Sequence, residues 1–247
     1  MKIVATYNIK GGVGKTATAV NLGYLAARDG FRVLLADLDP QAAATYLLRV
    51  RPRVKGGGEA LIQGSRELDA AIKGTDFENL DLLPADFTFR NLDLMLDATK
   101  KPTRRLTQLL RPLAGSYDLV FLDCPPGISL VSENVLHAAD VIVVPLIPTT
   151  LSVRTLDQLT EFVAEFDGRR PDVLAFFSMV DRRKKLHREI TENLYSERAR
   201  VAATTVPYLA VVENMSVQRA PVTVFAPRSS AARAYRALWS EIQDRTE

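Results

Sequence analysis

Short apolar runs alternate along the chain with longer stretches in which apolar residues recur every three or four positions. The short runs are typical of buried strands, and the longer spacing is typical of amphipathic helices. Strands that alternate with helices indicate βαβ units, in which the strands form one parallel sheet. We therefore expect strands at Lys2–Asn8, Val33–Ala36, Leu80–Leu83, Leu119–Leu122, Val141–Pro145, Leu174–Met179 and Thr205–Val206.

The stretches between these strands carry the helical pattern. In the first of them, residues 16–28, the apolar residues fall on one helix face and a glycine follows as a stop signal. Residues 49–59 contain a proline and three consecutive glycines, so we interpret them as a surface loop. Further helices are expected at residues 59–73, 103–114, 130–138, 153–167, 185–199 and 229–243. The pattern predicts an α/β fold with a mostly parallel, twisted sheet that has helices on both faces.

The last expected helix has one apolar stripe, made of Ala231, Tyr235, Leu238 and Ile242, and acidic residues near its end. A helix that lies on a membrane surface carries lysine and arginine along its polar face instead. We therefore expect this helix to pack on the core, and we expect no membrane partner.

The composition narrows the class of protein to which this chain can belong. The chain has 247 residues, 47% of them hydrophobic and 25% charged, which is usual for a globular protein, and we expect residues 1–247 to form one domain. No apolar run approaches the ~18 residues of a membrane span, and the N-terminus lacks a signal-peptide pattern. The single cysteine, Cys124, cannot supply a disulfide framework or a Cys-x-x-Cys metal site. These features predict a cytoplasmic protein.

The stretch NIKGGVGKTATAV, residues 8–20, carries the clearest chemistry. Its glycines keep side chains out of a turn between a strand and a helix, so that backbone N–H groups and the helix dipole face one concave space. Lys15 can reach the β- and γ-phosphates of a nucleotide, and the Thr16 hydroxyl can bind Mg²⁺. The residues predicted to contact ATP or ADP are Lys10, Gly11, Gly12, Val13, Gly14, Lys15, Thr16 and Ala17.

One position departs from the common phosphate-loop pattern G-x-x-x-x-G-K-[ST]. The first glycine is replaced by Ile9, and Lys10 follows it. This extra lysine marks the deviant Walker A motif, and here the chain resembles the ParA/MinD superfamily of P-loop ATPases. LLADLDPQ (34–41) resembles the switch I region of that superfamily, and YDLVFLDCPPG (117–127) resembles Walker B and switch II. Residues 206–242 resemble the ParA C-terminal region more loosely, so the resemblance spans the chain and implies a single P-loop NTPase domain.

Three carboxylates are candidates for the chemistry of phosphate transfer. Asp123 ends an apolar strand beside the loop, where it can organise the water shell of Mg²⁺, and Asp37 can assist it. The resemblance implies that Asp39 orients or activates the attacking water, although an Asp-x-Asp-Pro sequence can also simply cap a helix. We therefore expect catalysis from Lys10, Lys15 and Asp39, and metal binding by Thr16, Asp37 and Asp123.

Lys10 is redundant in a monomer, because Lys15 already serves the nucleotide bound by its own chain. In the family, the extra lysine reaches across a symmetric interface to phosphate in the other subunit. The resemblance therefore implies a homodimer when ATP is bound, and hydrolysis that loosens it.

The nucleotide base is harder to assign. Residues 176–183 are expected near the adenine edge of the site, and residues 206–210 on the opposite wall. Ser178 and Asp181 are weak candidates for contacts to the base.

Charge is unevenly distributed along the chain. The net charge is +3, but residues 182–236 contain eleven Lys and Arg against four Asp and Glu. Such an asymmetry favours a polyanionic partner. Arg228, Arg233 and Arg236 can equally be helix-surface charges. The candidates for DNA phosphate contacts are Arg182, Arg183, Lys184, Lys185, Arg188 and Arg219.

Two functions follow from these features. The first is a ParA-like ATPase that dimerises with ATP, binds DNA of the nucleoid without sequence preference and positions a cargo, such as a plasmid, a chromosome region or a protein assembly. Its weak hydrolysis would be stimulated by a ParB-like protein or a cargo adaptor. The second is an ATP-dependent protein-interaction switch without nucleic acid, in which the basic segment contacts an acidic protein.

Overall fold

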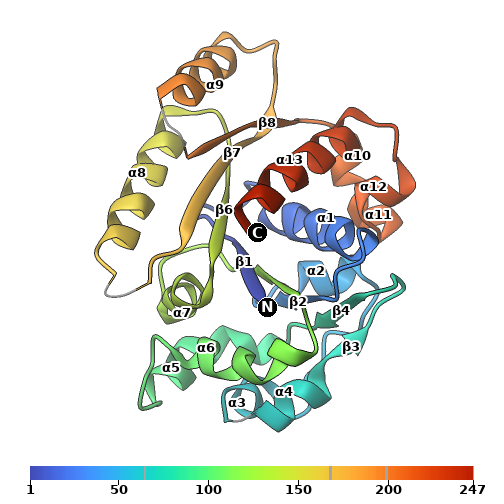
Figure 1. Cartoon of the computed structure of the whole chain (residues 1–247), viewed down its shortest axis with the longest axis vertical. Helices are drawn as coiled ribbons and strands as arrows, with labels where there is room; N and C mark the ends of the chain where they lie inside the picture. Colours follow the sequence, from blue (N-terminus) through green and yellow to red (C-terminus); the bar gives the residue numbers. More distant parts are fainter. Residues whose placement is uncertain (64, 167–168, 198–199, 247) are drawn as a thin grey trace.

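One eight-stranded sheet runs through the protein in the computed structural model, which describes residues 1–63, 65–166, 169–197 and 200–246 (Figure 1). The strands lie in the order β3-β4-β2-β5-β1-β6-β7-β8, and every neighbouring pair is parallel except β3 and β4. The predicted fold class is confirmed. The strands are β1 (Lys2–Thr6), β2 (Val33–Asp37), β3 (Lys73–Gly74), β4 (Leu80–Leu83), β5 (Leu119–Asp123), β6 (Val141–Leu146), β7 (Asp172–Val180) and β8 (Val201–Pro207).

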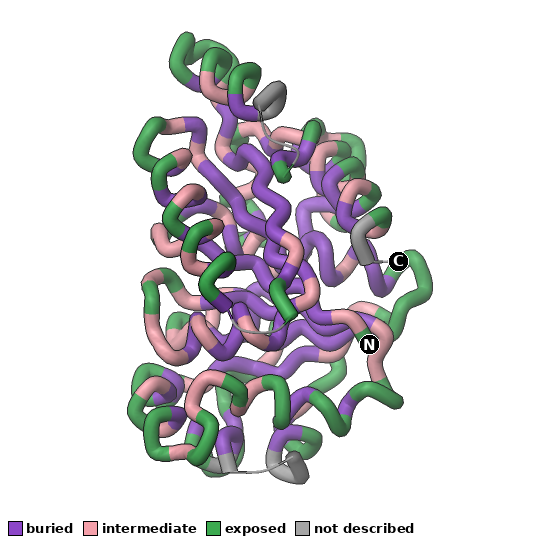
Figure 2. The backbone as a smooth tube through the Cα atoms, turned by 60° about the vertical axis from the view of Figure 1, so that its left-hand side comes forward, coloured by how far each residue is buried: buried purple, intermediate pink, exposed green. Residues whose placement is uncertain are grey.

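Helices cover both faces of this sheet, and Figure 2 shows the buried backbone between them. Successive strand residues belong to two separate cores: Val4 packs into one, and Ile3 and Ala5 pack into the other. Because both faces are buried, the strands read as apolar runs in the sequence. One face is covered by α1 (Lys15–Arg28), α2 (Ala43–Leu47), α10 (Ala210–Glu213), α11 (Met215–Gln218), α12 (Val222–Phe225) and α13 (Ser230–Thr246). The other is covered by α3 (Gly57–Gln63), α4 (Ser65–Ala71), α5 (Leu92–Asp97), α6 (Arg105–Leu110), α7 (Leu130–Ala138), α8 (Thr150–Ala164) and α9 (Lys185–Glu197).

Several predicted elements differ from those observed. The expected helix 59–73 is divided into α3 and α4, and its end pairs as the edge strand β3. The expected helix 103–114 is α6 followed by the 3₁₀ helix η2 (Arg111–Gly115), because Pro112 cannot donate the next helical hydrogen bond. Most of the expected loop 49–59 is irregular, but α3 begins inside it, at Gly57. Six short elements were not predicted, since so few residues show no period: α2, η1 (Phe87–Asn91), α5, α10, α11 and α12.

Other predictions agree closely with the structure. The strand Leu80–Leu83 and the helix 130–138 have the predicted bounds. Residue 167 of one expected helix and residues 198–199 of another lie outside the described residues. In α13 the stripe of Ala231, Tyr235, Leu238 and Ile242 is fully buried, which confirms that this helix packs on the core. None of the helices in the described ranges combines the length and apolarity that crossing a membrane requires.

The order of the strands brings several polar side chains to one edge of the sheet. β1 lies between β5 and β6, and the chain leaves β1 through the phosphate loop toward β2 on the far side of β5. Asp37 and Asp123 are register partners at the carboxyl ends of β2 and β5. In open parallel sheets, ligands bind at such an edge, where neighbouring connections diverge. The candidate site is therefore the edge formed by the ends of β1, β2 and β5.

Candidate functional site

The loop between β1 and α1 has the backbone of a phosphate cradle. Gly12 and Gly14 have φ angles of 69° and 95°, in the left-handed region that side chains disfavour. A β-carbon on Gly14 would lie 3.0 Å from Ser178 Oγ, so the conformation at this position favours glycine and the space for a side chain is tight. The loop ends at the N-terminus of α1, where free N–H groups and the helix dipole favour an anion.

Lys15 supplies a buried cation at the end of this loop. Its side chain is only 7% exposed, and its ammonium group donates to the carbonyl oxygen of Lys10 at 2.9 Å. Burial lowers the pKa of Lys15, while the charges of Asp123 and Asp39 act to raise it. A phosphate group bound here would supply the negative charge that favours the ammonium form.

Asp123 is the buried group at this edge that a bound cation would stabilise most. It is completely buried, and neither of its carboxylate oxygens accepts a hydrogen bond from the described residues. Burial, followed by the charge of neighbouring Asp37, raises the pKa of Asp123 well above its ordinary value, whereas the nearby Thr16 hydroxyl acts to lower it. A buried carboxylate that is short of hydrogen bonds is stabilised by a cation, and β5, which ends at Asp123, lies next to β1, whose loop leads to Thr16. These residues therefore fit a magnesium ion.

The structure also limits how such an ion could be held. Within the described ranges, no group of three or more His, Cys, Asp or Glu side chains is arranged to bind a metal. Mg²⁺ commonly takes one or two carboxylates and completes its six ligands with water and substrate phosphates. An ion at Thr16 and Asp123 would accordingly depend on the nucleotide for its remaining ligands.

Asp37 is committed to contacts within the protein. Its carboxylate accepts hydrogen bonds from the Thr45 hydroxyl and N–H, at 2.7 and 2.8 Å, and from the Asp39 N–H at 3.2 Å. Burial raises the pKa of Asp37 to about 6, although the bonds from Thr45 oppose this shift. These contacts make Asp37 a support for the turn that follows it, and its predicted contact with Mg²⁺ stays a prediction. Sequence analysis did not identify Thr45, which lies in the unpredicted helix α2.

Asp39 stands at the turn beyond Asp37. Its carboxylate is partly exposed and accepts the N–H of Gln41 at 2.9 Å, and the chain turns at Ala42 with φ 53°. The negative charge of Asp39 acts to raise the pKa of Lys15, so the two groups lie within electrostatic range of each other. A partly exposed carboxylate near a phosphate site can accept a proton from water or orient it.

The loop after Asp123 is joined to the phosphate loop. The N–H of Gly127 donates to the carbonyl oxygen of Ile9 at 2.9 Å, and the Tyr7 hydroxyl donates to the carbonyl oxygen of Gly127 at 2.8 Å. Lys10, next to Ile9, donates its backbone N–H to Asn8 Oδ1 at 2.9 Å. The Lys10 ammonium forms no ion pair with any described carboxylate.

A small cavity of about 60 Å³ adjoins the loop where the base of a nucleotide is expected. Gly14 and Ala17 line it together with Ser178 of β7, the end of β8 and the segment that follows β8. The two predicted segments, 176–183 and 206–210, thus meet beside the loop, but Asp181 does not line this cavity. A larger cavity of about 920 Å³, between α3, α5 and α6, is lined by no phosphate-loop residue, so size does not identify the nucleotide site here.

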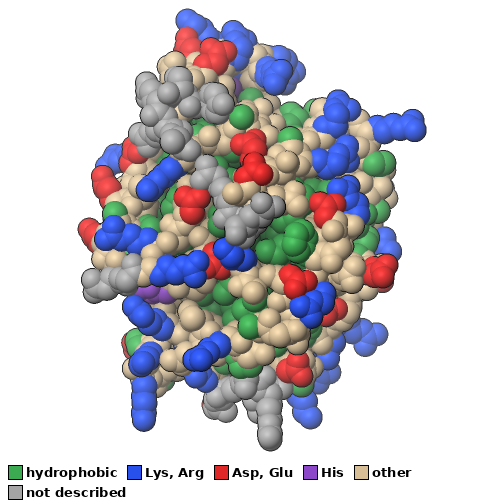
Figure 3. All heavy atoms as spheres, in the orientation of Figure 1, with side chains coloured by type: hydrophobic (Ala, Val, Ile, Leu, Met, Phe, Trp, Pro, Cys, Tyr) green, Lys and Arg blue, Asp and Glu red, His purple; other side chains and the backbone are tan. Residues whose placement is uncertain are grey.

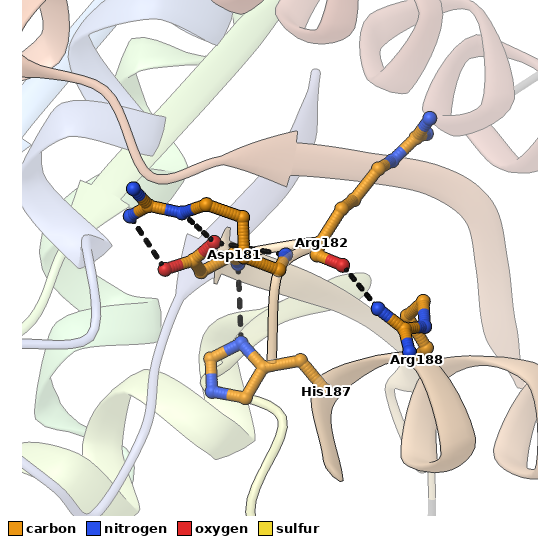
Figure 4. Close-up of polar contacts among 5 residues, drawn as sticks. Asp181, Arg182, His187 and Arg188 are labelled. Carbon is orange, nitrogen blue, oxygen red and sulfur yellow. Dashed lines mark hydrogen bonds and ion pairs between the residues drawn. The ribbon is translucent and has the colours of Figure 1, made fainter. Parts of the chain in front are cut away.

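The basic residues after β7 form a structured turn (Figure 4). The Asp181 N–H donates to Nδ1 of buried His187 at 3.1 Å, and burial lowers the pKa of His187, which favours the neutral, accepting ring. Arg183 forms an ion pair with Asp181 at 2.9 Å and holds the pKa of that carboxyl well below its ordinary value. Arg188 donates to the Arg182 carbonyl oxygen at 2.7 Å, and both arginines line a groove of about 400 Å³ between α9 and β8.

The predicted DNA contacts do not share one element. Arg182, Arg183 and Lys184 precede α9, and Lys185 and Arg188 belong to it, whereas the sixth residue, Arg219, ends α11. Figure 3 shows lysine and arginine side chains at the end of the molecule formed by α9, with acidic side chains among them. The main exposed basic cluster among the predicted DNA contacts therefore lies at the start of α9, and Arg219 is separate from it. We call this set the α9 cluster: Arg182, Arg183, Lys184, Lys185 and Arg188.

The fold and the loop define a P-loop nucleotide-binding protein with a second lysine at the start of its loop. A family model described as "AAA domain" matches residues 1–175. The chain is 32% identical over 247 residues to the sporulation initiation inhibitor protein Soj of Bacillus subtilis, covering 98% of each chain. It is 30% identical over 254 residues to the chromosome partitioning protein ParA of Caulobacter vibrioides, covering 99% of this chain and 95% of that protein. The chain belongs to the ParA/MinD family of P-loop ATPases.

A similar protein of known structure binds a nucleotide and a metal. The cobyrinic acid a,c-diamide synthase of Mycobacterium smegmatis has been solved with an ATP analog and magnesium bound. It is 28% identical to this chain, with a TM-score of 0.81 and coverage of 98% of this chain and 94% of that one. A protein with this fold therefore binds ATP-like nucleotides together with Mg²⁺.

Proposed function

We propose that this chain is an ATP-dependent dimerising switch that binds DNA and positions a cargo. The observation that carries the proposal is Lys10, whose ammonium stands at the phosphate loop without an acidic partner among the described residues. Lys15 already occupies the cation position of the loop. A second cation there suits the phosphate of a nucleotide bound by another subunit.

Each subunit has residues for binding and hydrolysing ATP. The N–H groups of the loop and Lys15 would bind the phosphates, and Thr16 and Asp123, with Asp37 as a further candidate, would hold Mg²⁺. The ion would neutralise charge on the β- and γ-phosphates. Asp39 would orient the attacking water and accept its proton, since this residue is partly exposed and its charge acts on Lys15.

Asp39→Ala is expected to slow ATP hydrolysis by about a hundredfold or more, because a positioned general base contributes roughly 10²–10⁴. ATP affinity should change by less than about threefold, since Lys15 and the loop are unaltered, so the variant accumulates as an ATP-bound dimer. Phosphate release and calorimetry measure the two quantities. Asp97→Ala, at an exposed carboxylate of α5, is the matched control. Wild-type hydrolysis by Asp39→Ala would mean that Asp39 only shapes the turn.

Lys10→Ala tests the dimer directly. The variant should bind ADP as the wild type does but stay monomeric with ATP, because the target of its ammonium lies in the other subunit. ATP that binds the dimer more tightly than the monomer shifts the population by mass action. Light scattering with ATP and with ADP follows the change in mass. Lys55→Ala, at an exposed lysine, should dimerise normally, and normal dimers of Lys10→Ala would contradict the trans contact.

DNA binding and positioning extend the proposal. The similar protein of Caulobacter vibrioides is named for chromosome partitioning, and the α9 cluster of this chain is suited to phosphate contacts that do not depend on sequence. The ATP-bound dimer would bind the nucleoid, and a ParB-like protein or cargo adaptor would stimulate hydrolysis and release it.

The alternative is a protein-interaction switch in which the same cluster contacts an acidic protein. The mixture of acidic side chains with the basic ones at α9 is compatible with that function. A salt titration of DNA binding by the ATP-loaded protein separates the two functions, since phosphate contacts make DNA affinity steeply salt-dependent.

A further inference from the structure

The short helix α2 is attached to the Asp37–Asp39 turn by buried hydrogen bonds. Thr45 is fully buried, and its N–H and hydroxyl both donate to Asp37 Oδ2, at 2.8 and 2.7 Å. The hydroxyl also accepts the N–H of Ala85 at 2.9 Å, so its hydrogen bonds are satisfied on both sides. Any movement of α2 would therefore move the carboxylates of this turn.

Two arginines join α2 to α11 in opposite directions. Arg49, just after α2, donates from Nε to the carbonyl oxygen of Arg219 at 3.1 Å and from Nη2 to that of Gln218 at 3.0 Å. Arg219 donates from Nε to the carbonyl oxygen of Tyr46 at 3.0 Å, and its guanidinium carbon lies 4.5 Å from the centre of the Tyr46 ring. We call these four residues the arginine clamp. Figure 1 shows α2 and α11 beside each other, in agreement with their contacts.

The other side of α11 is attached to the phosphate-loop helix α1. Asn21 of α1 is buried, and its amide group donates to Met215 Sδ of α11 at 3.2 Å. Its amide oxygen accepts the N–H of Thr223 at 3.4 Å. The helix that begins with Lys15 and the turn that carries Asp39 are therefore connected through α11 and α2.

The backbone at both arginines supports a constrained junction. Arg49 and Arg219 have φ angles of 61° and 48°, in the left-handed region that residues with a β-carbon rarely adopt. Such conformations persist where surrounding contacts hold them. Here those contacts are the clamp and the ends of the two helices, where the Arg49 N–H donates to the Tyr46 carbonyl oxygen at 3.1 Å and the Arg219 N–H donates to the Met215 carbonyl oxygen at 2.7 Å.

We propose that Arg49 and Arg219 are positioning residues for ATP hydrolysis: by holding α2 against α11, they fix Asp39 relative to the phosphate loop. The inference rests on the role proposed above for Asp39. It also assigns Arg219, a predicted DNA contact, a positioning role within its own subunit.

The test compares Arg49→Ala, Arg219→Ala and the double variant in steady-state ATP hydrolysis and in ATP binding by calorimetry. Each single variant should lower kcat on the order of tenfold, because misplacing a reacting group by about 1 Å can cost a hundredfold. ATP affinity should stay within about twofold, since Lys15 and the loop are untouched. The double variant should be no slower than the slower single variant, because the two arginines act as one unit.

Milder substitutions distinguish a positioning role of the arginines from an effect of their charge and from an effect on folding. Arg49→Lys and Arg219→Lys keep the charge but lose the guanidinium donors, so both should remain slow. Tyr46→Leu removes the ring and retains the backbone acceptor, and it should cause a smaller loss of kcat. Arg51→Ala, at an exposed arginine two residues beyond Arg49, should hydrolyse ATP at the wild-type rate. Thermal unfolding of each variant shows whether the fold is retained.

Four results would overturn the proposal: single variants with wild-type kcat, full rescue by lysine, a loss of ATP affinity as large as the loss of kcat, or multiplying effects in the double variant. Asp39→Ala is measured in the same experiment. If Asp39→Ala is slow and the clamp variants are not, only the clamp fails; if Asp39→Ala hydrolyses normally, the proposed role of Asp39 itself fails.

Discussion

Replacing Lys15 with alanine is expected to remove detectable ATP binding, a loss of at least about a hundredfold in affinity. Lys15 is the buried cation of the loop, and Asp123 and Asp39 carry negative charge near it. A hydrogen bond to a charged group contributes roughly 1.5–3 kcal/mol, and about 1.4 kcal/mol is tenfold in affinity. Without the ammonium, the phosphates would also meet these carboxylates unopposed. Calorimetry with ATP and Mg²⁺ measures the change.

The same variant should not lose stability. Burial lowers the pKa of Lys15, which means that the folded state disfavours its charged form relative to the unfolded state. Removing the ammonium takes away this cost to folding but also its hydrogen bond to the Lys10 carbonyl oxygen, so the two effects oppose each other and the Tm should change little. Lys100→Ala, at an exposed lysine far from the loop in sequence, is the control for ATP affinity. Unchanged affinity in Lys15→Ala would refute the phosphate-loop interpretation.

The phosphate loop could be predicted because its requirements are local. Left-handed backbone at Gly12 and Gly14, a cation at Lys15 and a strand before the loop all leave direct traces in the sequence. Asp123 could be predicted for a similar reason, since it ends a strand that reads as an uninterrupted apolar run. The sequence did not indicate that both oxygens of Asp123 are buried without a hydrogen bond from the described residues, because that depends on how neighbouring strands surround them.

The arginine clamp could not be predicted, because its partners are distant in the chain. Arg49 and Arg219 are 170 residues apart, and α2, which contains both Thr45 and Tyr46 of the clamp, has only five residues. No period identifies so short a helix, and neither arginine belongs to a motif. Only the packing of α11 against both α1 and α2 brings these groups together.

Charge counting along the chain has a related limit. A count of lysine and arginine in one segment includes every such residue, regardless of the direction in which its side chain points. In the fold, the cluster at α9 lies at the β8 edge, whereas Arg219 is engaged with α2 on the other side of the phosphate-loop helix. The α9 cluster is thus the better test of DNA binding.

For the ATP-loaded dimer, DNA affinity is expected to fall steeply with salt and to be similar for unrelated sequences. Each phosphate contact contributes a slope of about −0.9 in log K against log[salt]. Lys184 and Lys185 are exposed at the start of α9, and Lys185 has only a loose ion pair with Glu189, at 3.4 Å. Reversing both charges, in Lys184→Glu with Lys185→Glu, removes two contacts from each subunit. The slope should then become shallower by roughly 3.6 for the dimer.

The matched control is the double reversal Lys100→Glu with Lys101→Glu. It changes the net charge equally, but it lies between α5 and α6, at the opposite end of the molecule from α9 (Figure 1). Fluorescence anisotropy with a random duplex, at several salt concentrations and with ATP or ADP, should show a large loss only for the α9 variant. ATP affinity and dimer mass are measured in parallel, because the α9 turn follows β7, which lines the predicted base cavity. An equal loss in the control would mean that net charge, and not the α9 surface, drives binding. If the ATP-loaded wild type ignores DNA even at low salt, DNA binding is refuted and the protein-interaction switch replaces it.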